Sequence, residues 1–171
     1  MNVDRILDTM NRHQVAYVLI GGMNFLLRHA PVLTLDIDLW VEDAPENLRR
    51  CEAALAELDA QWGASDDDWG PVSAKRPGWL ERQAVFCLTS PDGPIDIFRR
   101  VAGLDDWRSS FQNALREQTV SRVSYWGLSD EDMLQCQLAL EEGHRKLDRI
   151  AALEKAIRAS RGQHESGTEE G

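Results

Sequence analysis

The sequence has no long hydrophobic run and little cysteine. None of its apolar stretches approaches the roughly 20 residues that an α-helix needs to cross a bilayer, and the first residues show no secretion signal. The three cysteines, Cys51, Cys87 and Cys136, are odd in number and far apart, so neither a disulfide framework nor a zinc site is indicated. These absences predict a cytoplasmic protein with free thiols and no membrane partner.

Positive charge is also scarce. The chain has 19 Lys and Arg against 29 Asp and Glu, which gives a net charge of −10 at pH 7. This balance weighs against broad binding of nucleic acids, because such binding neutralises phosphates with Lys and Arg, but it does not exclude a local basic patch. With 171 residues, the chain is long enough for one domain with a substantial core.

The segment around Gly21-Gly22 has the pattern of a strand followed by a turn and a helix. The apolar run Val15 to Ile20 reads as a central strand, and Met23 to His29 has a helical pattern. Glycines at such a junction let the backbone approach a ligand, and the free N–H groups of a helix start favour an anion such as phosphate. An ordinary strand-to-helix turn is the alternative reading of the two glycines alone.

A second apolar run carries Asp36 and Asp38 as alternate residues. In a strand they share one face about 7 Å apart, while Leu35, Ile37 and Leu39 turn toward a core. Burying unpaired carboxylates is costly, whereas Mg²⁺ prefers oxygen ligands beside a substrate phosphate. The pattern therefore favours a metal site, with solvated acids on an exposed edge strand as the alternative.

A third acid, Asp96, lies in a predicted hairpin. Arg82 to Thr89 and Pro94 to Phe98 read as strands, and Ser90 to Gly93 between them is a strong turn signal. The hairpin is expected to place Asp96 in the sheet beside the first acidic strand.

The remaining apolar patterns predict mainly helices. Ser129 opens a capping motif, and the helix after it and the last helix are expected to form a hairpin packed on the core. The expected division is residues 1–126 as core, 127–160 as helical hairpin and 161–171 as disordered tail. Helices are expected over Val3 to Arg12, Pro45 to Leu58, Trp107 to Arg116, Met133 to Leu140 and 144–157, and an edge strand over Thr119 to Trp126.

Between Trp62 and Leu80 the periodicity disappears. A long loop in a compact domain is often functional or mobile. Its acidic run, Asp66 to Asp68, is read as a solvated turn rather than a metal site. Lys75 is a candidate for contact with a triphosphate or an acidic acceptor, and a plain solvent-facing side chain is the alternative.

Apolar-Gly-Gly, a helix, Asp-x-Asp on a strand and a later strand acid together resemble the nucleotidyltransferase superfamily of DNA polymerase beta-like fold. The resemblance covers about residues 3–157, and it is strongest to small bacterial proteins related to abortive-infection type IV toxins and to minor antibiotic nucleotidyltransferases. It implies an α+β (mixed α/β) fold, with a mixed sheet flanked by helices and a C-terminal helical hairpin.

The resemblance also implies roles for individual residues. Two Mg²⁺ ions would be held by catalytic carboxylates, namely Asp36, Asp38 and Asp96. A nucleoside triphosphate would be bound by Gly21, Gly22, Asn24, Lys75 and Lys146.

Two positions depart from the family pattern. Relatives often carry a Lys in the helix after the Ser-x-x-Asp start, where this chain has Gln137. The Arg-x-Lys-Asp-like segment of the last helix survives loosely as Arg145 to Asp148, so Lys146 is a substitute for the missing Lys. A charged surface face on an amphipathic helix is the alternative for Lys146.

The expected function is Mg²⁺-dependent transfer of a nucleoside monophosphate to a hydroxyl of an RNA, a protein or a small molecule. A toxin with a cognate antitoxin is a special case, and a cationic antibiotic suits the acidic body as acceptor. The main alternative is a non-catalytic antitoxin or scaffold, although three retained acids argue against it. A metal-dependent nuclease is the weakest rival. The sequence identifies neither the base nor the oligomeric state.

Overall fold

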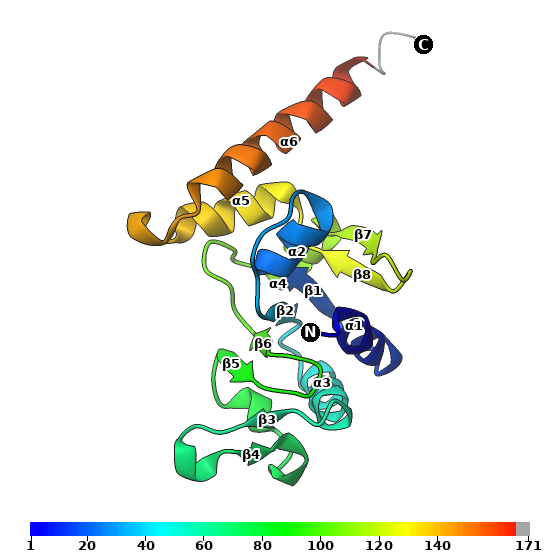
Figure 1. The fold of residues 1–171 in the computed structure, drawn as a ribbon, viewed down its shortest axis with the longest axis vertical. Helices are drawn as coiled ribbons and strands as arrows, with labels where there is room; N and C mark the ends of the chain where they lie inside the picture. Colours follow the sequence, from blue (N-terminus) through cyan, green and yellow to red (C-terminus); the bar gives the residue numbers. More distant parts are fainter. Residues whose placement is uncertain (167–171) are drawn as a thin grey trace.

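A six-stranded mixed sheet forms the body of the molecule (Figure 1). The structure is a computed structural model that describes residues 1–166, with side chains up to residue 162. The strand order is β5-β6-β2-β1-β8-β7, with β2 parallel to β6, β1 parallel to β8 and the other neighbours antiparallel. The strands are β1 (Tyr17–Ile20), β2 (Ile37–Val41), β5 (Val85–Leu88), β6 (Ile95–Phe98), β7 (Leu115–Gln118) and β8 (Ser124–Gly127).

Helices cover both faces of this sheet, which confirms the predicted α+β class (Figure 1). Helices α1 and α3 pack on one face, and residues of α2, α4, α5 and α6 pack on the other. The helices are α1 (Val3–Arg12), α2 (Gly21–Arg28), α3 (Pro45–Glu57), α4 (Trp107–Asn113), α5 (Asp130–Ala139) and α6 (Leu147–Ser166). None of the helices described is long and apolar enough to cross a membrane.

The side chains of β2 point alternately to the two faces of the sheet. Ile37 and Leu39 are fully buried in the core under α1 and α3, whereas Trp40 packs in the second core under the later helices. Because side chains alternate, Asp38 shares the face of Trp40. The acids of the sheet therefore face the C-terminal helices. Leu35 was expected in the core but is 71% exposed, because it lies in the loop before β2 begins.

The segment from Gln61 to Glu81 is more ordered than the predicted loop. It forms a small second sheet of β3 (Gln61–Trp62) and β4 (Gly70–Pro71), followed by short 3₁₀ turns. Trp62 stacks on Trp79 at 5.5 Å, and Phe86 meets both rings edge-on. Trp62 and Trp79 are core residues at irregular spacing, which explains why no period is visible in the sequence.

The prediction for residues 107–126 was wrong in part. Helix α4 ends at Asn113, and Leu115–Gln118 form the edge strand β7, while β8 lies inside the sheet between β1 and β7. Strand β7 is largely exposed and lacks apolar alternation, so its sequence does not distinguish it from the end of a helix. The turn between the strands places Arg122 at a φ of +67°.

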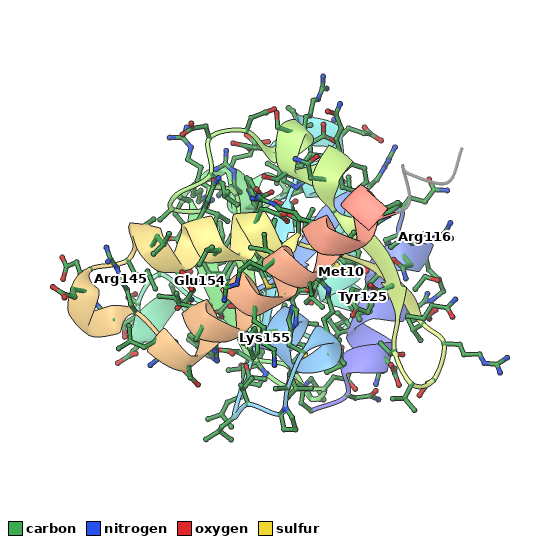
Figure 2. All side chains as sticks on the ribbon, turned by 90° about the horizontal axis from the view of Figure 1, so that it is seen from above. Met10, Arg116, Tyr125, Arg145, Glu154 and Lys155 are labelled. Carbon is green, nitrogen blue, oxygen red and sulfur yellow. The ribbon has the colours of Figure 1, made fainter. Side chains whose placement is uncertain are left out.

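The C-terminal helices form the predicted hairpin. Figure 2 shows α5 and α6 side by side above the sheet, with Arg145 at the turn that joins them. The Ser129 side chain caps α5 by accepting the N–H of Asp132 at 3.2 Å, as predicted. Helix α6 continues to Ser166, so residues 161–166 are helical and not part of a disordered tail as expected; no proline interrupts this segment. Residues 167–171 of the predicted tail lie outside the described residues.

Polar contacts hold the hairpin to α2. Arg28 at the end of α2 donates to the carbonyl of Leu128 at 2.6 Å and pairs with Asp130 at 2.7 Å. The His29 ring lies 2.9 Å from the same carboxylate. The first turn of α5 is thus fixed to the helix that follows Gly21-Gly22.

Candidate active site

The structure brings Asp36, Asp38 and Asp96 together. Asp38 and Asp96 are register partners on the parallel strands β2 and β6, and Asp36 immediately precedes β2. The Thr34 hydroxyl donates to Asp36 Oδ1 at 3.1 Å, which helps to hold that side chain. One carboxylate oxygen from each of the three acids lies within 4.8 Å of the others. We call these three residues the acid cluster.

The acid cluster is electrostatically strained without a cation. Burial, and then the charges of Asp36 and Asp96, raise the pKa of Asp38 to about 7. The N–H of Gly22 and the charge of Arg149 oppose this shift. Burial also raises the pKa of Asp96. A bound dication would lower both pKa values, because its charge offsets the burial of the carboxylates and the repulsion among them.

The donor atoms of the cluster suit Mg²⁺. All are carboxylate oxygens, the ligands that hard cations prefer, and they lie within 4.8 Å of one another. The Cys87 thiol, opposite Asp96 on β5, is hydrogen-bonded to the Asp96 carboxylate, and burial raises its pKa. Because the thiol stays protonated, it does not change the hard character of the site.

Gly21 and Gly22 are the first residues of α2 and lie directly against Asp38. Gly21 has a φ of +67°, and a Cβ there would lie 2.0 Å from Asp38 Oδ2. A Cβ on Gly22 would lie 2.7 Å from the hydroxyl oxygen of Thr34. Gly21 is therefore needed for the helix start to approach the Asp38 carboxylate, and Gly22 is needed for it to approach Thr34.

A cavity of about 480 Å³ opens beside Asp38, between the sheet and the C-terminal hairpin. Its volume is in the range of small-molecule sites. Most of its wall is apolar, from Ile20, Phe25, Phe98, Leu128, Met133 and Leu153. Its charged and amide side chains are those of Asp38, Arg100, Gln137 and Arg149.

Arg149 is a site residue that the sequence reasoning missed. Its guanidinium lies over the Phe25 ring at 5.6 Å and close to Gly22, and it forms no hydrogen bond with any residue that the structure describes. It precedes the buried Leu153 and Ile157 by four and eight residues, so it is aligned with the buried face of α6. A cation at that position of an apolar stripe is the signal that could have identified it.

Among the predicted nucleotide-binding residues, Gly21 lines the cavity and Gly22 is next to it in the chain, whereas Asn24, Lys75 and Lys146 do not line it. Asn24 is fully buried and donates from Nδ2 to the Leu128 carbonyl at 3.0 Å, so it joins α2 to the hairpin. Lys75 lies near the small sheet, where its Nζ pairs with Asp68 at 2.8 Å. Figure 1 places that sheet at the opposite end of the molecule from α5 and α6. The Lys146 side chain is exposed.

No protein-family model and no curated protein matches the chain. Among solved structures, it is similar to a putative nucleotidyltransferase from Thermotoga maritima, TM1012, at 19% identity and a TM-score of 0.52, over 94% of this chain and 89% of that one. It is also similar to JHP933 from Helicobacter pylori at 12% identity and a TM-score of 0.37, over 83% of this chain and 56% of that one. The second likeness is too distant to support an argument. The first shows that the chain shares the fold of the Thermotoga protein.

Proposed function

We propose that the protein is a metal-dependent nucleotidyltransferase that moves a nucleoside monophosphate from a nucleoside triphosphate to an acceptor hydroxyl. The observation that carries this proposal is the acid cluster at the edge of a cavity, where three carboxylates lie close together and burial, with the two neighbouring charges, raises the pKa of Asp38 to about 7. The fold shared with the Thermotoga protein supports it. The acceptor class is an RNA, a protein or a small molecule, and a toxin with a cognate antitoxin is a special case.

In this proposal, Asp36, Asp38 and Asp96 hold two Mg²⁺ ions. Held there, the ions would supply charge stabilisation for the entering and leaving oxygens. The Asp96 carboxylate takes the proton of the attacking hydroxyl. The hydroxyl oxygen forms a bond to the α-phosphorus, and the bond to pyrophosphate breaks.

The cations of the cavity complete the donor site. Arg149 has free N–H donors beside the start of α2, and a guanidinium binds phosphate oxygens in pairs. Arg100 is exposed at the cavity wall and also has no protein partner among the described residues. We assign the triphosphate to Arg149 and Gly21-Gly22, in place of the Lys75 and Lys146 expected from the sequence.

Transfer of label from α-³²P nucleoside triphosphates to total RNA, total protein or a cationic antibiotic tests this function. The wild type with Mg²⁺ is expected to label one acceptor class. The Asp36→Asn, Asp38→Asn double variant should lose at least about 100-fold of the rate, because it removes two metal ligands. Asp67→Asn, in the exposed acidic run, is the matched control and should retain full activity. Labelling that survives the double variant contradicts the proposal.

A further inference from the structure

Strand β5 is the edge of the sheet beside the acid cluster (Figure 1). Its neighbour is β6, on which Asp96 lies opposite Cys87. Hydrogen bonds alternate along an antiparallel pair, and the Ala84 carbonyl makes one of those to β6 by accepting the Arg99 N–H at 2.8 Å. Val85 and Cys87 therefore direct their backbone N–H and C=O groups away from β6, toward the open edge.

The Cys87 backbone is unpaired at this edge. Neither its N–H nor its C=O bonds to any residue that the structure describes. The next outward-facing residue, Thr89, exchanges two backbone hydrogen bonds with Gln61 of β3, so the small sheet covers the edge only beyond Cys87. The exposed side chains of β5 are those of Val85 and Cys87, and neither is charged.

The other edge of the sheet is protected in a way that β5 is not. Strand β7 carries Arg116 and Glu117, and charged side chains on an edge strand hinder pairing with a further strand. An open, uncharged edge is a surface to which an extended peptide adds as a new strand through main-chain hydrogen bonds. The β5 edge therefore suits a polypeptide, because the backbone of RNA or of a small molecule has no such alternation of N–H and C=O groups.

The strand order places the β5 edge on the acceptor side of the proposed reaction. Gly21 follows β1, which neighbours β2 on the side away from β6, and Arg149 lies close to Gly22. The triphosphate assigned to these residues is therefore on the β1 side of Asp38. In-line displacement needs the attacking hydroxyl opposite the leaving pyrophosphate, and that side is formed by β6, with Asp96, and by β5.

Resting on the proposed function, we infer that the acceptor is a tyrosine in an extended segment of another protein, which pairs with β5. The side chain of a residue paired with Cys87 would share the face of the acid cluster, two strand spacings or about 10 Å from Asp96. Tyrosine is the longest of the three hydroxyl side chains, and serine or threonine at that position is too short. The phenol oxygen bonds to the α-phosphorus, its proton passes to the Asp96 carboxylate, and pyrophosphate leaves.

Charge favours a basic segment as this acceptor. The three acids and a triphosphate carry more negative charge than two Mg²⁺ ions neutralise, and the chain as a whole has a net charge of −10. Lys or Arg beside the tyrosine would offset the remainder, whereas RNA would add a phosphate with each nucleotide.

Transfer of label from the four α-³²P nucleoside triphosphates, with Mg²⁺, to synthetic pentapeptides tests the inference. The peptides have blocked ends and the pattern Lys-X-Tyr-X-Lys, with X drawn from Val, Ile and Thr. The wild type should label them at least about tenfold faster than peptides with Ser in place of Tyr, because the shorter side chain misplaces the hydroxyl. Peptides with Glu in place of Lys should also be labelled more slowly.

Methylation of the peptide backbone tests strand pairing without changing the protein. Every second N–H of an added strand faces β5, and the others face solvent. Methylating the tyrosine nitrogen and methylating the nitrogen of the next residue should therefore have opposite effects, one abolishing labelling and the other sparing it.

A variant of the edge gives a second test. Val85→Pro removes an outward N–H without removing a hydrogen bond to β6, and should lower peptide labelling at least about tenfold. Because Val85 also lines the cavity, labelling is compared at saturating nucleotide. Arg116→Pro is the matched control, since Arg116 is an outward-facing residue of β7, and it should label peptides like the wild type.

The outcomes separate this inference from the proposed function. Peptide labelling that is insensitive to which nitrogen is methylated, or equal in wild type and Val85→Pro, overturns docking on β5. A wild type that labels RNA or a cationic antibiotic but none of the peptides overturns the protein acceptor and leaves the transferase proposal standing. A wild-type dimer that Val85→Pro converts to a monomer assigns the edge to a second copy and also overturns the inference. No transfer to any of these acceptors by a folded wild type overturns both.

Discussion

Asp38 has to be charged to hold a metal, but its surroundings favour the neutral acid. Burial and two neighbouring carboxylates raise its pKa to about 7, while the Gly22 N–H and Arg149 give partial compensation. Each unit of pKa shift corresponds to about 1.4 kcal/mol between the two protonation states. The site is therefore built for a ligand that brings positive charge, rather than for the stability of the metal-free fold.

The free energy of unfolding should depend on pH through Asp38. Its folded pKa exceeds that of an unfolded Asp, so the native state binds more protons between about pH 4 and 7, and metal-free stability falls as pH rises through this range. Urea unfolding in EDTA at pH 5 and pH 8 should show Asp38→Asn gaining stability relative to wild type at the higher pH, by at most about 4 kcal/mol. Asp67→Asn should show no such gain. A difference between Asp38→Asn and wild type that is independent of pH would contradict the assignment.

Gly21 should tolerate no side chain. Its φ of +67° and the 2.0 Å approach of Asp38 mean that Gly21→Ala must move the helix start or the carboxylate. We expect the free energy of unfolding, measured with urea, to fall by about 1–3 kcal/mol. We also expect nucleotide binding to be lost. Gly143→Ala is the control, because a Cβ there meets nothing within 4 Å, and it should be neutral within about 0.5 kcal/mol. Equal stability of the two variants would show that the close contact is not as described.

Individual site residues were predictable from the sequence to different degrees. The three acids and two glycines stand out because charged residues and glycines interrupt apolar runs. Arg149 does not, since a charge on a polar helix looks like ordinary surface until the packing of α6 is known. Asn24 was chosen because it follows the two glycines, and Lys75 because it lies in a loop. In the structure Asn24 bonds the Leu128 carbonyl and Lys75 pairs with Asp68, so neither side chain is in the cavity wall.

At the scale of elements, the hairpin of α5 and α6 closes the cavity, and its position depends on the end of α2. Arg28 is only 9% exposed and joins Leu128 and Asp130 to α2. The elements with strong periodicity were predicted from the sequence, including β1, β2, the β5–β6 hairpin and the capped α5. Strand β7 was not, because an exposed edge strand of polar residues has no pattern of its own.

Removing the Arg28 contact should loosen the hairpin. Arg28→Met leaves the Asp130 carboxylate and the Leu128 carbonyl without this partner. The free energy of unfolding should therefore fall by about 3 kcal/mol. Hydrogen exchange in the first turns of α5 should rise as well. The control is Arg158→Met, because Arg158 pairs at the surface with Glu154 at 3.8 Å. This change should lower the free energy of unfolding by less than about 0.5 kcal/mol. Unchanged exchange in α5 would mean that packing alone fixes the hairpin.

At the scale of the whole molecule, the fold joins a core that holds the acids to a helical hairpin that covers them. The overall architecture followed from the order of motifs, since strand, glycine turn, helix and acidic strands leave few arrangements. The small sheet of β3 and β4 lies at the opposite end of the molecule from α5 and α6 in Figure 1, and the core beside it is packed by Trp62 and Trp79. Its irregular spacing of buried residues explains why the sequence suggested a functional loop instead.

Divalent cations should stabilise the whole protein through the acid cluster. Mg²⁺ at about 100 times its dissociation constant adds about 2.7 kcal/mol if it binds only the folded state. At pH 8, Mg²⁺ should therefore raise the midpoint temperature of thermal unfolding in the wild type. The rise should be much smaller in Asp96→Asn. Asp67→Asn should behave like the wild type. A shift of equal size in the wild type and Asp96→Asn would place the cation elsewhere.

The most direct test of the central claim is calorimetric titration of nucleoside triphosphates into the wild type and Asp38→Asn, with and without Mg²⁺. We expect binding that requires both the metal and the Asp38 carboxylate, because the acid cluster is the proposed link between the ion and the triphosphate. Binding of equal affinity without Mg²⁺, or in Asp38→Asn, would contradict the account.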